Sequence, residues 1–342
     1  MNFNSIRTSL KLILLIFYCF IASSSTYAQS NLSSNSNINS QKNYVKWLAQ
    51  IPSVDNQQEH QKFKDKFFNF ILGKKTSGLS KPVAVYAHGC DSVIILDQGC
   101  QTILDLNMKI GELSPRYDNK KYRFPSLIGI CATTNSSFLI TDSKLNKIFI
   151  INHKDKVLKE FNDSFVFQQP TGIAYSSKSK TVWVIETAAH KISVFDEKGD
   201  FIYSIGKRGT AHGEFNFPTF IWIDSLDQAY VVDAMNYRIQ LFDSKGQFIK
   251  AFGKAGDATG YFARPKGIAT DSFGNIYVVD ALFNAVQIFD KSGNFLYQFG
   301  SQGQDKEQFW MPSGIFIDKN NYIYVADSYN SRIQIFQLVK ED

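Results

Sequence analysis

The chain has 342 residues, of which 44% are hydrophobic and 15% aromatic, and its formal net charge is +6 at pH 7. This composition allows a sizeable buried core, and the aromatic content favours β structure. The modest net charge does not by itself indicate a nucleic-acid partner, and four cysteines in a chain of this length exclude a fold that depends on disulfides.

Residues 1–28 have the pattern of a secretory signal peptide. Arg7 and Lys11 precede an apolar run that begins at Leu12 and ends at Ala22, and small residues lead to Ala28. The alternative is a membrane anchor, but the run is shorter than the roughly 20 apolar residues that a spanning helix needs. We expect cleavage after Ala28 and an exported mature chain, periplasmic or secreted, that keeps no transmembrane segment.

The next three segments differ in composition. Residues 29–42 are mostly Asn, Ser and Gln, which predicts a flexible tether. Residues 44–51 predict a strand. Residues 57–72 predict a short helix, because Phe63, Phe67, Phe68 and Ile71 fall on one helical face.

A repeat of about 45 residues fills the rest of the chain. Its marker is a proline that begins a short apolar segment and is followed, 15 to 17 residues later, by an acid, and the prolines are Pro82, Pro125, Pro170, Pro218, Pro265 and Pro312. The repeats lie near 82–124, 125–169, 170–217, 218–264, 265–311 and 312–342. Each contains four short β patterns separated by turn sequences, which is typical of propeller blades. We therefore expect an all-β domain over 43–342, a six-bladed β-propeller of four-stranded antiparallel blades.

The later repeats carry a recognisable motif. Gly267-Ile-Ala after a proline, Tyr277-Val-Val-Asp280 and Asn330-Ser-Arg-Ile333 resemble the NHL repeat. The first three repeats depart from it, since Gln101 and His190 stand where the motif has other residues. The resemblance implies a six-bladed propeller that binds macromolecules, in a family that also contains a few enzymes.

The last repeat ends after its third strand, so a fourth strand must come from elsewhere if the ring is to close. We expect residues 44–51 to supply it. The alternative donor is 67–72, which also resembles a fourth strand but has helical spacing.

The acid that ends each second strand is the most regular polar feature. A ring of metal-binding carboxylates is one interpretation; the other is that each acid accepts backbone N–H bonds in its own turn. A role repeated in six blades favours structure over catalysis. We therefore expect structural turn acids at Asp97, Asp142, Glu186, Asp233, Asp280 and Asp327.

Histidines and cysteines test for an enzyme. The peptide-amidating lyase, an NHL-type propeller, holds zinc through several histidines, but His60, His88, His153, His190 and His212 do not converge on one blade position. We expect no metal, no cofactor and no catalytic residue. Cys90 and Cys131 fall towards one face and could pair, whereas Cys100 lies at the other end of its strand.

Because strands alternate in direction, the blade-to-blade loops and the second-to-third turns share one face, which we call the loop face; the other turns form the turn face. The loop face holds more cations, with aromatic residues among them. Its unrepeated cluster at 116–124 and neighbouring loops are the predicted binding surface: Arg116, Tyr117, Lys120, Lys121, Tyr122, Arg123, Lys207, Arg208, Lys254, Arg264 and Trp310.

These features predict a non-enzymatic, monomeric binding or scaffolding protein whose partner is a protein or an anionic glycan of the envelope. The signal peptide argues against nucleic acid. The alternative is a propeller hydrolase or lyase, resembling gluconolactonases or the amidating lyase, with a divalent metal in the central channel.

Overall fold

The computed structural model describes residues 43–51, 78–88, 92–108, 112–117, 122–134, 137–152 and 158–340. The expected signal peptide, the tether and the helix over 57–72 lie outside these residues. None of the helices in the described part of the chain is long and apolar enough to cross a membrane.

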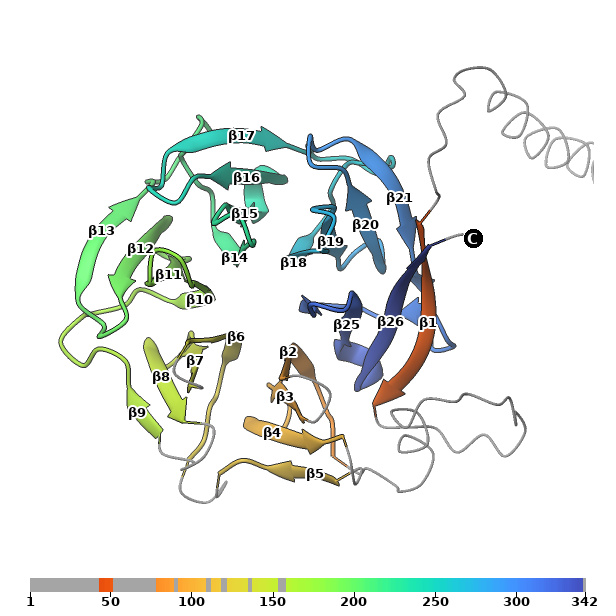
Figure 1. The fold of residues 1–342 in the computed structure, drawn as a ribbon, viewed down its shortest axis with the longest axis horizontal. Helices are drawn as coiled ribbons and strands as arrows, with labels where there is room; N and C mark the ends of the chain where they lie inside the picture. The colour runs from red at the N-terminus through yellow and green to blue at the C-terminus, as the bar shows by residue number, and fades with distance from the viewer. Residues whose placement is uncertain are drawn as a thin grey trace, which may run out of the picture. The chain divides into compact units, whose positions relative to one another are not determined.

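Six four-stranded antiparallel sheets follow one another along the chain, as the repeats predict (Figure 1). The first three blades are β2 (Pro82–His88), β3 (Ser92–Asp97), β4 (Thr102–Asn107) and β5 (Glu112–Pro115); β6 (Leu127–Ala132), β7 (Ser137–Asp142), β8 (Lys147–Asn152) and β9 (Leu158–Glu160); β10 (Pro170–Ser176), β11 (Thr181–Glu186), β12 (Lys191–Asp196) and β13 (Phe201–Ile205). The next two are β14 (Pro218–Ile223), β15 (Ala229–Asp233), β16 (Arg238–Phe242) and β17 (Phe248–Phe252); β18 (Pro265–Thr270), β19 (Ile276–Asp280), β20 (Ala285–Phe289) and β21 (Phe295–Phe299).

The sixth blade is built from both ends of this unit. Its strands are β24 (Ile315–Ile317), β25 (Tyr322–Asp327), β26 (Arg332–Lys340) and β1 (Asn43–Ile51), in the order β1-β26-β25-β24. The strand predicted over 44–51 is thus present and lies beside β26, in the position that the fourth strand takes in the other blades.

Two small elements complete the described structure. Single-turn 3₁₀ helices, η1 (Ala234–Asn236) and η2 (Ser328–Asn330), join the second and third strands of blades four and six. The loop between blades five and six contains a short parallel pair, β22 (Ser301–Gln302) and β23 (Gln308–Phe309).

The core lies between neighbouring sheets, because the second strands are buried on both faces. Phenylalanines that recur every 47 residues fill the gap below each connecting loop: Phe215, Phe262 and Phe309 have 0% exposed surface. A Cβ on Gly253, which has φ of +92°, would stand 2.3 Å from the Phe262 ring, so the loop requires glycine there. Tyr117 and Phe124, expected as exposed loop aromatics, are buried in this core instead.

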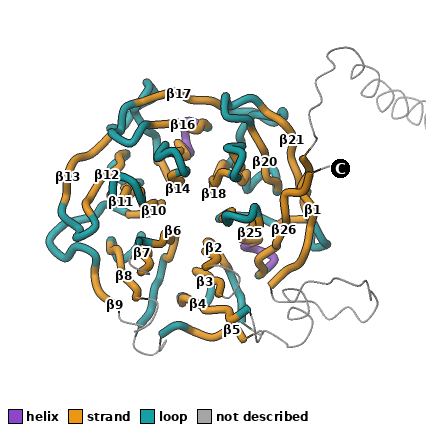
Figure 2. The backbone as a smooth tube through the Cα atoms, viewed as in Figure 1, coloured by secondary structure: helices purple, strands orange, loops and turns teal. Residues whose placement is uncertain are grey.

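The first strands lie nearest the centre of the ring and the fourth strands at its periphery (Figure 2). This arrangement places the two ends of every first strand on opposite faces, one at the loop face and one at the turn face. Any ligand in the centre therefore meets first-strand residues from all blades.

Candidate functional site

The six repeated acids are all fully buried, and their hydrogen bonds lie within the blade framework. Asp97 accepts from the backbone N–H groups of Ser80, Lys81 and Cys100. Asp280 likewise accepts from Ala263, Arg264, Leu282 and Phe283. Each carboxylate thus ties the loop that enters its blade to the turn after its second strand or, for Glu186, to the third strand through Ser193, so these carboxylates are engaged within the blade.

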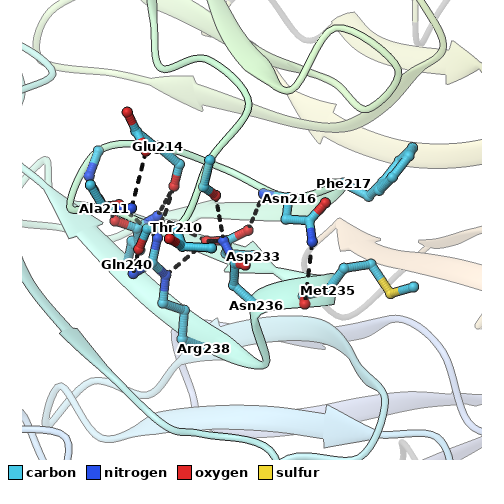
Figure 3. Close-up of polar contacts among 12 residues, drawn as sticks. Thr210, Ala211, Glu214, Asn216, Phe217, Asp233, Met235, Asn236, Arg238 and Gln240 are labelled. Atoms are coloured by element: carbon cyan, nitrogen blue, oxygen red, sulfur yellow. Dashed lines mark hydrogen bonds and ion pairs between the residues drawn. The ribbon is translucent and has the colours of Figure 1, made fainter.

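Asp233 shows the fullest version of this arrangement (Figure 3). Its carboxylate accepts from Asn216 N, Asn236 Nδ2, Arg238 Nε and Gln240 Nε2 at 2.7 to 3.1 Å. The Arg238 guanidinium also donates to the carbonyls of Thr210, Ala211 and Glu214, which fixes the incoming loop. Asp327 and Arg332 repeat the pattern in blade six.

Neighbouring first strands approach each other most closely at four glycines. Cβ atoms built on Gly129, Gly172, Gly267 and Gly314 would each stand 2.4 to 2.8 Å from backbone of the next blade's first strand. Gly267 N also donates to Ser313 O at 2.9 Å. We call this level the glycine collar; it requires glycine because two backbones meet there.

A cavity of about 720 Å³ lies on the turn-face side of the glycine collar. Its lining comes from the first strands of all six blades, from the collar down to Asp318, Lys319 and Asn320 at the turn face. Apolar and aromatic side chains dominate, among them Tyr86, Trp222 and Phe316. The cavity was not foreseen, since no pattern in the sequence marks empty space.

Arg116 and Tyr117 do not belong to an exposed surface, contrary to expectation. The Arg116 guanidinium is buried, donates twice to the Asp105 carboxylate at 2.7 and 2.8 Å, and donates to Asn152 O. Tyr117 packs in the core between the first two blades. The unrepeated segment therefore stabilises blades one and two with these side chains; Lys120 and Lys121 lie outside the described residues.

The other predicted binding residues are scattered around the loop face. Arg123, Arg208 and Arg264 are exposed, and Tyr122 is half-buried. Lys207 lies 3.4 Å from Glu214, and the Lys254 ammonium stands 4.2 Å from the centre of the Tyr261 ring. Trp310 is 43% exposed.

The structure adds residues to this face that sequence reasoning missed. Tyr329 lies against Trp310, with ring centres 5.7 Å apart, and the Lys81 ammonium stands 5.6 Å from the Tyr329 ring. Met235 and Leu282, each 54% exposed, occupy the same position in their second-to-third turns as Tyr329. Met235, Leu282 and Tyr329 each lie two residues after the acid of their repeat, and this equivalence is the sequence signal that could have identified them.

The histidines and cysteines that the structure describes lie apart. His190 is buried and its Nδ1 accepts from Phe217 N, whereas His212 is exposed and stacks on Phe248. No group of three or more His, Cys, Asp or Glu residues is suitably placed for a metal ion within the described ranges. Cys131 is a buried free thiol and Cys100 an exposed one, and Cys90, the partner considered for Cys131, lies outside the described residues.

Comparison with known proteins supports the architecture. A family model described as a 6-bladed beta-propeller matches residues 157–250 and 271–341. No curated protein matches the sequence.

Solved structures resemble the fold at low sequence identity. An auxiliary nutrient binding protein from Bacteroides thetaiotaomicron has a TM-score of 0.62 and 15% identity, covering 76% of this chain and 70% of its own. A gluconolactonase from Xanthomonas campestris has a TM-score of 0.60 and 11% sequence identity, and the match covers 76% of this chain and 87% of the gluconolactonase. Virginiamycin B lyase from Staphylococcus aureus has a TM-score of 0.57 and 16% sequence identity, and the match covers 77% of this chain and 97% of the lyase. Binding proteins and enzymes thus share this fold, and function has to be argued from the sites.

Proposed function

We propose that this six-bladed propeller, with NHL-type repeats, is a non-enzymatic binding protein of the extracytoplasmic space that engages an acidic protein partner through its loop face. The observation that carries the proposal is a patch of neighbouring aromatic, aliphatic and cationic side chains, four of them exposed and two, Lys81 and Lys266, half-buried. We call it the loop-face patch: Lys81, Arg264, Lys266, Leu282, Trp310 and Tyr329.

Contacts between neighbouring loops hold the patch together. Tyr329 N donates to Trp310 O, and Ala281 N, beside Leu282, donates to Arg264 O. Met311, next to Trp310, donates its N–H to Asn284 Oδ1, which links blade five to the loop that enters blade six. The patch therefore stands on a hydrogen-bonded frame, and its side chains are positioned before a partner arrives.

The chemistry of the patch favours a protein. Trp310, Tyr329 and Leu282 are 43%, 52% and 54% exposed, and side chains of this kind gain free energy when a partner's apolar groups cover them. Lys81, Arg264 and Lys266 surround them and would attract carboxylates. An anionic glycan would satisfy the cations but would offer little apolar surface to Leu282.

The proposed location rests on the N-terminal sequence, where Arg7, Lys11 and the apolar run from Leu12 fit an export signal. The proposed absence of catalysis rests on the repeated acids, because their carboxylates accept hydrogen bonds from groups of the blade framework. Conversion of a lactone by the purified chain, lost when a chelator removes bound metal, would support the hydrolase or lyase alternative instead.

The test is capture of a partner from the native envelope by immobilised wild type and by two variants. Trp310→Ala/Tyr329→Ala removes the aromatic part of the patch. Phe273→Ala is the matched control, because Phe273 is a 41% exposed aromatic on the turn face. We expect one protein that wild type and Phe273→Ala retain, that the double variant loses, and that elutes as salt rises. Equal retention by all three proteins would overturn the proposal.

A further inference from the structure

The cavity below the glycine collar is a second site, on the side of the ring opposite to the loop-face patch. Its lining reaches the turn face through Asp318, Lys319 and Asn320. Between the two sites, the first strands meet backbone to backbone at the collar. A ligand in the cavity therefore does not need to touch the loop-face patch.

Equivalent positions along the first strands show where this cavity departs from the repeat. One residue beyond the collar, the six blades carry Val85, Ile130, Ile173, Ile221, Ile268 and Ile315. At the next position they carry Tyr86, Cys131, Ala174, Trp222, Ala269 and Phe316. Packing alone maintains a uniform aliphatic ring at the first level, so the mixture of sizes at the second level calls for another explanation.

The three large residues of the second level form one wall. Ring centres of Tyr86 and Phe316 lie 4.6 Å apart, and those of Phe316 and Trp222 lie 6.0 Å apart. Trp222 and Phe316 come from blades four and six; the small side chain of Ala269 in blade five lets them approach each other. Trp222 Nε1 donates to Thr270 Oγ1 at 2.8 Å, which fixes the indole.

The opposite wall is small and aliphatic. Cys131 and Ala174 occupy the second level in blades two and three, and both line the cavity. Small side chains facing an aromatic wall leave a space of the size that drug-like ligands occupy, since such pockets hold roughly 300 to 1,000 Å³.

We propose that this cavity binds a neutral small molecule with a planar ring, which stacks against Tyr86, Trp222 and Phe316 and accepts a hydrogen bond from the Tyr86 hydroxyl. The Tyr86 hydroxyl has no hydrogen-bond partner among the described residues, so a donor is available there. Burial raises the pKa of Tyr86 to about 12, which keeps this donor protonated at neutral pH.

Neutrality follows from the charges around the site. The charged groups of the lining, Asp318 and Lys319, stand at the turn-face end. Asp318 Oδ1 already accepts from Asn320 N and Tyr322 N at 2.9 Å, and Lys319 is exposed to solvent. A charged ligand placed between the aromatic and aliphatic walls would lose its hydration without gaining a counter-charge.

The probe for this site is prodan, a neutral naphthalene ketone whose emission shifts with polarity and with hydrogen bonding. We expect saturable one-to-one binding to the wild-type protein. Phe316→Ala should raise Kd about tenfold, or about 1.4 kcal/mol, because it removes the middle ring of the wall. Tyr86→Phe should shift the bound emission further to the blue, because the hydrogen bond to the ketone is lost while the ring remains.

The control is Trp310→Ala/Tyr329→Ala, which removes two aromatic rings from the other face and should leave Kd unchanged. Melting temperatures confirm that each variant is folded. No saturable binding, binding lost in the control but not in Phe316→Ala, or equal affinity for an anionic anilinonaphthalene sulfonate would each overturn the proposal. Because Trp310→Ala/Tyr329→Ala is expected to lose partner capture but to keep prodan binding, failure of one proposal is distinguishable from failure of the other.

Discussion

Single buried carboxylates hold this propeller together, and Asp233 is the clearest case. It has no exposed surface and accepts four hydrogen bonds, one of them from Arg238. Asp233→Ala leaves the partly buried guanidinium and two amides without their shared acceptor. We expect the free energy of unfolding to fall by about 3–5 kcal/mol, measured by urea denaturation, because a broken buried ion pair costs about that much.

The matched control for Asp233 is Asp257→Ala, since Asp257 is exposed in the next connecting loop. Its free energy of unfolding should change by no more than about 0.5 kcal/mol. A similar small change for Asp233→Ala would mean that the blade does not need this carboxylate for its stability. Its role would then have to be the binding of a ligand.

Closure of the ring depends on one element, the strand β1. Arg332 Nη1 donates to Gln50 Oε1, and Trp47 Nε1 donates to Gln334 Oε1, so β1 is joined to β26 through side chains as well as by strand pairing. Ala49 and Ile51 are buried in the core shared by blades six and one.

Deletion of residues 43–52 should therefore lower the melting temperature far more than deletion of 29–42. The first deletion exposes the edge of β26 and part of a core, whereas the second removes a segment expected to be a tether. Thermal unfolding followed by circular dichroism compares the two truncations. Equal melting temperatures would show that β1 does not close the ring.

The elements also show why the first three blades were harder to identify from sequence. The residue before each third strand has a positive φ near +54° in all six blades: Gln101, Asn146, His190, Tyr237, Asn284 and Ser331. Five different residue types thus share one backbone conformation. Residue type alone does not reveal it, because the surrounding hydrogen bonds rather than the side chain fix this turn.

At the scale of the whole molecule, spacing and strand alternation predict the six blades and the two faces, because both follow from the repeat. They do not predict which loop cations are free. Arg116 looks like an exposed basic residue in sequence, but its ion pair with Asp105 in β4 holds it in the interior. The cavity also escapes prediction, since it depends on how far six first strands stand apart.

The electrostatic behaviour of the whole loop face provides a last prediction, centred on Lys266. Burial, together with the nearby charges of Arg264 and Lys81, lowers the pKa of Lys266 to about 8. The patch therefore loses a positive charge as pH rises through 8, and capture of an acidic partner should weaken between pH 7 and pH 9. Lys266→Met should weaken capture at pH 7 and remove this pH dependence.

Stability should change in the opposite direction. The pKa of Lys266 in the folded state lies below its ordinary value of 10.5, so the unfolded state binds more protons between about pH 8 and 10.5, and folding becomes more favourable as pH rises through that window. At pH 7 Lys266→Met should melt at a higher temperature than wild type, and the difference should shrink towards pH 10. Lys207→Met, with an exposed side chain, is the control and should follow wild type at every pH. A constant difference between Lys266→Met and wild type across this range would show that Lys266 does not titrate there, and the loss of capture would then need another cause.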